Sequence, residues 1–351
     1  MKKILLFLSL VFVFTGCSSK KEKRTNTFYD TFDTQIIYLE YTKTEKEYEE
    51  NYNFVKDEFT RLHKLYDNYR KYEGINNIST VNEKAGKEAV VVDKDLFNLV
   101  KFSIDNYEKS LGYTNIAMGS VLDIWHDVRE KNKELEESER TLPNREALEE
   151  ADKHTDINNI VLNEEDSSIY IKDPKTQIDL GAVAKGYAVE LIAQKLEEKG
   201  VENGSINAGG NVRTIGKPGD GRETWGVALQ NPNMEAKGFL DVLYIEGSKS
   251  VVTSGDYQRF FTYKGKNYHH LINPYELEPT QNYRAVTVVT KDSGLADLLS
   301  TAFFLAKPEE YDQLIENYKD QDIGLIWANE TIEKNTDNMN EIMASKGAKS
   351  R

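Results

Sequence analysis

The segment Ile178–Ala188 reads IDLGAVAKGYA and is the most informative part of the chain. The pattern predicts a strand that ends at Asp179, a tight turn at Gly181, and a helix whose first turn begins near Lys185. The N-terminus of such a helix presents free main-chain N–H groups and a positive dipole end, which suit a phosphate. Ordinary α/β loops also use glycine, so this segment alone leaves a plain loop and a phosphate site equally open.

Two further segments follow with their own turn signals. Residues 204–216 read GSINAGGNVRTIG, a strand that runs into a glycine pair and would let the main chain approach a ligand closely. Residues 251–274 read VVTSGDYQRFFTYKGKNYHHLINP. Their aromatic strands on either side of Lys264-Gly265-Lys266 predict a hairpin that carries His269 and His270.

A fourth segment, residues 286–305, reads VTVVTKDSGLADLLSTAFFL and predicts a strand, a turn and an apolar helix. Asp297 and Thr301 are four residues apart on that helix and therefore share one face. A carboxylate and a hydroxyl directed together from an apolar helix indicate a site for a hard, oxygen-seeking cation.

Taken together, these segments resemble the ApbE family of FAD:protein FMN transferases. The motifs that carry the resemblance are, in chain order, IDLGAVAKGYA, INAGGNVR, VTSGDYQRFF, HHLINP and LADLLSTAFF, with FDT at 32–34 and GYTNIAMGSVLDIW at 112–125 as weaker upstream signatures. The resemblance covers nearly the whole mature chain, from about Thr31 to about Leu325. It implies an α+β fold of mixed and antiparallel sheets with packed helices, an ApbE-like, T-fold-related architecture in one compact, two-lobed unit.

The resemblance also implies an activity: Mg²⁺-dependent transfer of FMN from FAD, the substrate, to a Ser or Thr hydroxyl of an exported protein, with release of AMP. The implied metal ligands are Asp297, Thr301 and the carbonyl of Ala182. The implied contacts to the flavin nucleotide are Phe32, Tyr113, Thr114, Asn115, Asp179, Lys185 and Ile272. His270 matches the family histidine and is expected to help remove the acceptor proton. Its neighbour His269 is expected to face away, because adjacent strand residues point to opposite sides.

Two segments depart from the family pattern. Asn273 replaces the aspartate of H-x-I-D-P, the T-G pair after it is missing, and Asn115 stands where aspartate is common. Asparagine keeps hydrogen-bonding capacity but loses charge and basicity, so flavin binding is better supported than turnover. A Mg²⁺-dependent FAD pyrophosphatase and a non-catalytic FAD-binding lipoprotein therefore stay open. A solute-receptor lipoprotein would have no need of the Asp297–Thr301 pair.

The N-terminus has the features of an export signal: two lysines, an apolar run over 4–14, and then Thr15-Gly16-Cys17. The run is too short for a stable membrane span, so residues 1–16 are expected to be removed. Cys17 is the only cysteine and follows Gly16 as in a lipobox, although a chance cysteine after an ordinary signal stays open. We expect lipidation at Cys17, a polar tether over 17–27 and anchoring at the extracytoplasmic face of the bacterial cell membrane.

The remaining boundaries and partners follow from composition. Residues 28–330 are expected to form the transferase domain, and residues 331–351, which lack an apolar pattern, are expected to fray. A net charge of −14 argues against a nucleic-acid partner. The acceptor is expected to be an extracellular electron-transfer protein or a subunit of a membrane redox complex, and the sequence does not identify it.

Overall fold

The computed structural model describes residues 20–236 and 238–351. Its centre is a sheet of eight strands in the order β1-β2-β6-β7-β10-β13-β14-β15, with every neighbouring pair antiparallel. The strands are β1 (Glu22–Thr31), β2 (Thr34–Thr42), β6 (Asn203–Ala208), β7 (Asn211–Gly216), β10 (Ser250–Gly255), β13 (Ala285–Thr290), β14 (Gly324–Ala328) and β15 (Ile332–Asn335). The sheet therefore brings together segments from both ends of the chain.

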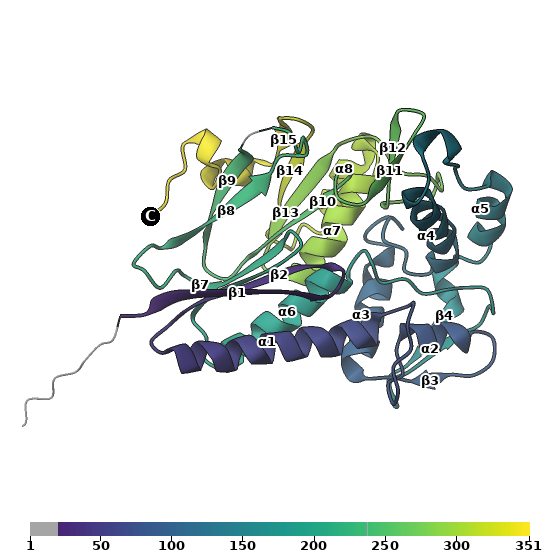
Figure 1. Cartoon of the computed structure of the whole chain (residues 1–351), viewed down its shortest axis with the longest axis horizontal. Coiled ribbons are helices and arrows are strands. Elements are labelled where there is room, and N and C mark those ends of the chain that lie inside the picture. The colour runs from purple at the N-terminus through teal and green to yellow at the C-terminus, as the bar shows by residue number, and fades with distance from the viewer. Residues whose placement is uncertain (1–19, 237) are drawn as a thin grey trace, which may run out of the picture.

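Helices α1 (Glu45–Tyr66), α6 (Ala184–Glu198) and α7 (Ser293–Leu305) cover one face of this sheet (Figure 1). The hairpin of β8 (Thr224–Gln230) and β9 (Phe239–Glu246) covers the other. Strand alternation separates the two cores: Val252 packs with the helices, whereas its neighbour Val251 packs with the hairpin. The central strands of the sheet are thus buried on both sides, whereas most of β1 is exposed.

The other elements flank one end of the sheet (Figure 1). They are α2 (Ile78–Glu83), α3 (Lys94–Tyr107), α4 (Gly119–Lys133), α5 (Arg145–Asp152), α8 (Tyr311–Asn317), the small sheet of β3 (Val90–Val91), β5 (Ser168–Ile171) and β4 (Ile160–Asn163), and the hairpin of β11 (Phe260–Tyr263) and β12 (Lys266–His269). The predicted α+β class is confirmed. So is the hairpin at Lys264-Gly265-Lys266, where Lys264 and Gly265 take the left-handed conformation that a tight turn needs.

Both ends of the described chain are more ordered than the sequence predicted. The prediction of a polar tether over 17–27 is wrong from Glu22 onward, because β1 begins there and pairs with β2 along its length. The fraying predicted for 331–351 is also wrong: Met339 and Met343 are buried, and the main-chain N–H of Tyr244 donates to the carbonyl of Ile342. Main-chain pairing supplies the order at β1, and two buried methionines supply it in the tail. The predicted signal and Cys17 lie outside the described residues.

The first motif also differs from its prediction, since Ile178–Leu180 belongs to no strand. The side chain of Asn82 takes the place of a partner strand: its Oδ1 accepts from the N–H of Ile178, and its Nδ2 donates to the carbonyl of Ile178. The N–H of Asp179 donates to the carbonyl of Ile116. A buried carboxamide that satisfies both main-chain groups cannot be recognised from the local pattern.

Candidate active site

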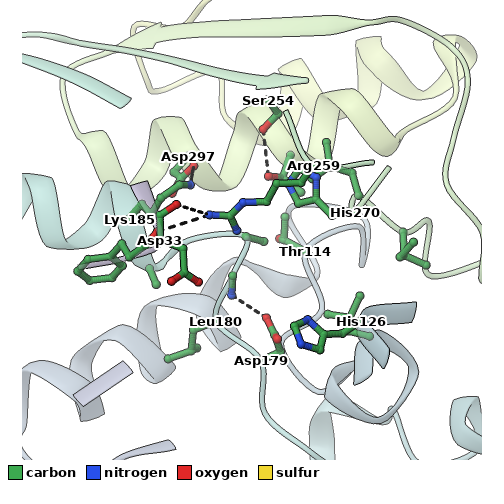
Figure 2. Close-up of a pocket in the computed structure, with 18 of the residues that line it drawn as sticks. Asp33, Thr114, His126, Asp179, Leu180, Lys185, Ser254, Arg259, His270 and Asp297 are labelled. Atoms are coloured by element: carbon green, nitrogen blue, oxygen red, sulfur yellow. Dashed lines mark hydrogen bonds and ion pairs between the residues drawn. The ribbon is translucent and has the colours of Figure 1, made fainter. Parts of the chain in front are cut away.

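A cavity of about 300 Å³ is lined on one side by residues of α6, α7 and β10, and on the other by residues of α4 and of the loop after α1. It is lined by every predicted site residue that the structure describes: Phe32, Tyr113, Thr114, Asn115, Asp179, Ala182, Lys185, His270, Ile272, Asp297 and Thr301. Figure 2 shows Asp297 and Lys185 on one wall and Asp179 and His126 on another, with Arg259 extending between them. The fold thus gathers residues from along most of the chain, while their individual roles stay predictions.

Asp297 is buried and is held by contacts to the start of α6. It is 3% exposed, and its Oδ2 accepts a hydrogen bond of 2.8 Å from the main-chain N–H of Gly186, in the first turn of α6. The ammonium of Lys185 lies 3.7 Å from its Oδ1. Because burying a carboxylate is costly unless it is paired, these two contacts keep the charge of Asp297 in place beside the cavity.

Thr301 lies one helical turn beyond Asp297, and its Oγ1 is 3.3 Å from the hydroxyl of Ser254 in β10. Ser254 also bonds the hydroxyl of Ser300 at 2.8 Å. Within residues 20–236 and 238–351 no three His, Cys, Asp or Glu side chains cluster as metal ligands. A cation here would therefore use one carboxylate, a hydroxyl, a main-chain carbonyl and oxygens of the substrate, a donor set that fits Mg²⁺.

Asp179 lies on the opposite wall (Figure 2). One of its oxygens accepts the N–H of Gly181 at 2.7 Å, and the other accepts from Nδ2 of Asn68 at 3.1 Å. Burial raises the pKa of Asp179 above its ordinary value, while these bonds oppose the rise. A Cβ on Gly181 would lie 2.9 Å from Oδ1 of Asp179, so close approach rather than an unusual φ calls for glycine here.

His270 lines the cavity, and its main-chain N–H donates to the carbonyl of Arg259. Burial lowers the pKa of His270 to about 3, so the imidazole is neutral at neutral pH. Its Nδ1 is buried and has no hydrogen-bond partner among the described residues. His269 is not among the residues that line the cavity, and its Nε2 lies 2.7 Å from the carbonyl of Thr280, in keeping with the predicted alternation.

The predicted nucleotide contacts from the 113–115 segment have partners of their own. The Thr114 hydroxyl donates to Ser110, and the Asn115 side chain donates to the carbonyl of Thr155 and accepts from the N–H of Ala117. Asn115 therefore holds its own loop together. Phe32 has a positive φ of 54° and packs edge-on against His63 and Tyr66, so its ring forms part of the cavity wall.

Asn273, the departure from the family pattern, is not among the residues that line this cavity. It is 1% exposed, donates to the carbonyl of Leu305 and accepts from the N–H of Tyr275. The first bond joins the loop after His270 to the end of α7, and the second holds the loop itself together. An asparagine makes these two bonds without a charge to bury, which accounts physically for the residue at this position.

Several lining residues were not predicted: Asn68, Tyr69, His126, Arg129, Ser254 and Arg259. Ser254 and Arg259 stand inside the VTSGDYQRFF motif and could have been taken from it. Arg259 reaches across to donate to the carbonyl of Asp33 at 3.1 Å (Figure 2). The others come from the loop after α1 and from α4, where nothing in the local sequence marks them.

Comparison with known proteins gives the family of the chain. The profile of the ApbE family matches residues 32–327. The chain belongs to the ApbE family. A curated FAD:protein FMN transferase of Klebsiella pneumoniae is 28% identical over 250 residues, which are 70% of this chain and 74% of that protein. One from Treponema pallidum is 29% identical over 271 residues, 73% of this chain and 72% of that protein.

Solved structures of the family share the fold. The ApbE protein of Thermotoga maritima has a TM-score of 0.74 at 25% identity, covering 89% of this chain and 97% of that one. The flavin transferase ApbE of Vibrio cholerae has a TM-score of 0.71 at 19% identity, covering 92% of this chain and 99% of that one. At 19% identity, the likeness to the Vibrio cholerae structure is one of fold alone.

The N-terminus has a match of its own. Residues 1–18 match the profile of the prokaryotic membrane lipoprotein lipid attachment site. Among the helices of residues 20–236 and 238–351, none combines the length and apolarity that a membrane span needs.

Proposed function

We propose that this ApbE-family protein transfers FMN from FAD to a Ser or Thr hydroxyl of an exported redox protein and releases AMP. The observation that carries the proposal is the buried Asp297, held by Gly186 and Lys185 beside Thr301, in the same cavity as Asp179 and His270. In this proposal the wall of Lys185 and Asp297 faces the pyrophosphate, and the wall of Asp179 faces the nucleotide.

In the proposed reaction the acceptor oxygen forms a bond to the flavin-side phosphorus of FAD. The bond between that phosphorus and the bridging oxygen breaks, AMP leaves with the electron pair, and the acceptor proton passes to the neutral imidazole of His270. Lys185 and the N-terminus of α6 stabilise the charge on the pyrophosphate. Asp297, Thr301 and the carbonyl of Ala182 would hold Mg²⁺, which supplies neutralisation of phosphate charge when bound.

The test uses the protein from Ser18 onward with FAD, Mg²⁺ and an apo flavin-acceptor domain. After denaturing electrophoresis, a fluorescent acceptor band that requires Mg²⁺ and is lost in Asp297→Ala supports transfer. FMN and AMP formed equally with or without the acceptor, and no labelled band, would instead make the protein an FAD pyrophosphatase. FAD binding with neither AMP nor a band would make it a flavin carrier.

We also propose that Cys17 carries a lipid and holds the domain at the extracytoplasmic face of the cell membrane. The match of residues 1–18 to a lipid attachment site supports this proposal. Replacing Cys17 by Ala should abolish incorporation of radiolabelled palmitate and move the protein from the membrane fraction to the supernatant. Unchanged labelling would contradict it.

A further inference from the structure

A second cavity, of about 370 Å³, lies next to the first, between the large sheet and the hairpin of β8 and β9. It shares Thr34, Gly209, Thr253 and Gln258 with the first cavity, the proposed site for FAD. Thr253 is followed in β10 by Ser254, whose hydroxyl lies 3.3 Å from that of Thr301. Because successive strand residues face opposite sides of the sheet, Ser254 lies on the α7 side and the second cavity on the hairpin side. The two cavities therefore meet at these four shared residues, which is where an acceptor hydroxyl would have to pass.

One wall of this second cavity is a strand with a free edge. Val227, Ala228, Leu229 and Gln230 of β8 line it, and no residue of β9 does. In the part of the chain that the structure describes, β8 pairs only with β9. The outer edge of β9 is occupied, because the N–H of Tyr244 donates to the carbonyl of Ile342 in the C-terminal tail.

The same contact shows which groups of β8 are free. Because the N–H of Tyr244 points away from β8, its directly opposed partner Gly226 also points its N–H and C=O away from β9. With a period of two, Ala228 does the same. Across residues 20–236 and 238–351, these main-chain groups of Gly226 and Ala228 make no hydrogen bond, and both residues are exposed. Such an edge is a template for a further strand.

The chemistry of the lining indicates what kind of strand fits. Among residues 20–236 and 238–351, those that line the second cavity include no charged side chain and offer the carboxamides of Gln35, Asn207, Gln230 and Gln258. Burying a charge in this groove would be costly, whereas main-chain amides and small polar groups would find partners. At the far end of the hairpin, Met234 and Phe239 are 65% and 66% exposed, and Phe239 is opposite Gln230 in the ladder. These two exposed apolar side chains offer a further contact surface for whatever protein supplies the added strand.

We propose that the second cavity is the docking groove for the acceptor protein. An extended, uncharged acceptor segment adds to the free edge of β8, and its Ser or Thr hydroxyl passes through the shared mouth to the flavin-side phosphorus. This inference rests on the proposed transferase function and uses the bond changes given for it. Main-chain hydrogen bonds supply the affinity, so the groove accepts segments of varied sequence whose side chains are small and uncharged.

The first test removes a single donor from the edge. Ala228→Pro deletes an N–H that points away from β9 and leaves the ladder to β9 intact, whereas Ala228→Ser keeps the N–H and is the matched control. With the apo acceptor domain as substrate, we expect KM for the acceptor to rise about tenfold in Ala228→Pro, the loss of about 1.4 kcal/mol of binding. FAD affinity, measured by flavin fluorescence, and the unfolding temperature should match those of Ala228→Ser.

The second test uses the wild-type protein and is independent of how well any variant folds. A set of peptides centred on the acceptor residue, each N-methylated at one main-chain nitrogen, is labelled with FAD and Mg²⁺. Pairing with β8 predicts that labelling is lost at alternate positions, because only every second N–H of an added strand faces its neighbour.

The outcomes separate the two proposals. Wild-type protein that labels no acceptor overturns the transferase function itself. Labelling with an unchanged KM in a folded Ala228→Pro protein, or N-methyl effects without a period of two, overturns the groove and leaves the transferase standing.

Discussion

The main-chain N–H of Gly186 and the carboxylate of Asp297 are joined by a hydrogen bond of 2.8 Å, which links the first turn of α6 to the middle of α7. The contact requires glycine. A Cβ at position 186 would lie 2.2 Å from the carbonyl oxygen of Ser293 and 2.4 Å from the Cβ of Asp297. The glycine of the first motif and the aspartate of the last therefore form one packed unit.

Gly186→Ala should accordingly push α7 away from α6 and displace Asp297. We expect a loss of about 1–3 kcal/mol in the free energy of unfolding, typical of overpacking, together with a loss of FMN transfer. Gly226→Ala is the control, because its Cβ would meet nothing nearer than 3.7 Å. Chemical denaturation of both variants measures the effect. Equal stability of the two would contradict the close packing.

Thr301 offers a clean test of the proposed cation site. Thr301→Ser keeps the hydroxyl and Thr301→Val removes it at nearly the same volume. If the hydroxyl is a ligand, Thr301→Val should need on the order of 10- to 100-fold more Mg²⁺ for half-maximal transfer, while Thr301→Ser stays close to the wild type. Titration of Mg²⁺ at saturating FAD gives both values. A parallel weakening in the two variants would point to packing instead.

His270 should stay neutral, and so free to accept a proton, over an unusually wide range of pH. Burial lowers its pKa to about 3, so the neutral form is present above that value and is lost only as the pH falls toward it. We therefore expect kcat/KM to show no acidic limb from this residue near pH 6.5, the ordinary value. His270→Ala should lower kcat roughly 100-fold and leave FAD affinity unchanged. A limb near pH 6.5 that disappears in His270→Ala would refute this.

The raised pKa of Asp123, on α4, leads us to expect that the stability of the protein depends on pH. Burial, together with the charge of Asp179, raises its pKa to about 6. Between its ordinary pKa and about 6 the folded state binds more protons than the unfolded state, so this residue makes stability fall as the pH rises through that window. Asp123→Asn should therefore be more stable than the wild type at pH 7, by about 1 kcal/mol after allowance for partial solvent exposure, and no more stable at pH 4. Thermal unfolding at the two pH values measures the difference, and an equal gain at both would argue against the ionisation.

The start of α7 depends on a buried ion pair between Arg213 and Glu190. The guanidinium Nε lies 2.9 Å from Oε2 of Glu190, and the same oxygen accepts the N–H of Ser293 at 2.8 Å. Arg213→Met leaves Glu190 buried without its partner and should cost about 3–5 kcal/mol. The double variant Arg213→Met, Glu190→Leu removes both charges and should recover part of that loss. Denaturation curves that show the double variant as the less stable would contradict the pairing.

The sequence by itself determined the family, the α+β class, and the shared face of Asp297 and Thr301. These depend on local order and periodicity: five motifs in a fixed succession, and a helix in which positions four apart lie one above the other. Helix α1 was predictable for the same reason, since its apolar stripe recurs at helical spacing.

Only the tertiary structure decided which groups meet across the fold. Asn82 replaces a strand partner for Ile178, and Asn68 reaches Asp179. The C-terminal tail covers the edge of β9, while in the described part of the chain β8 has no second neighbour. Each of these contacts joins segments far apart in the chain. Each supplies a hydrogen-bond partner to a main-chain group or a carboxylate, and the local sequence does not indicate which partner that will be. Their pairing depends on burial and on the order of the strands, which no local pattern encodes.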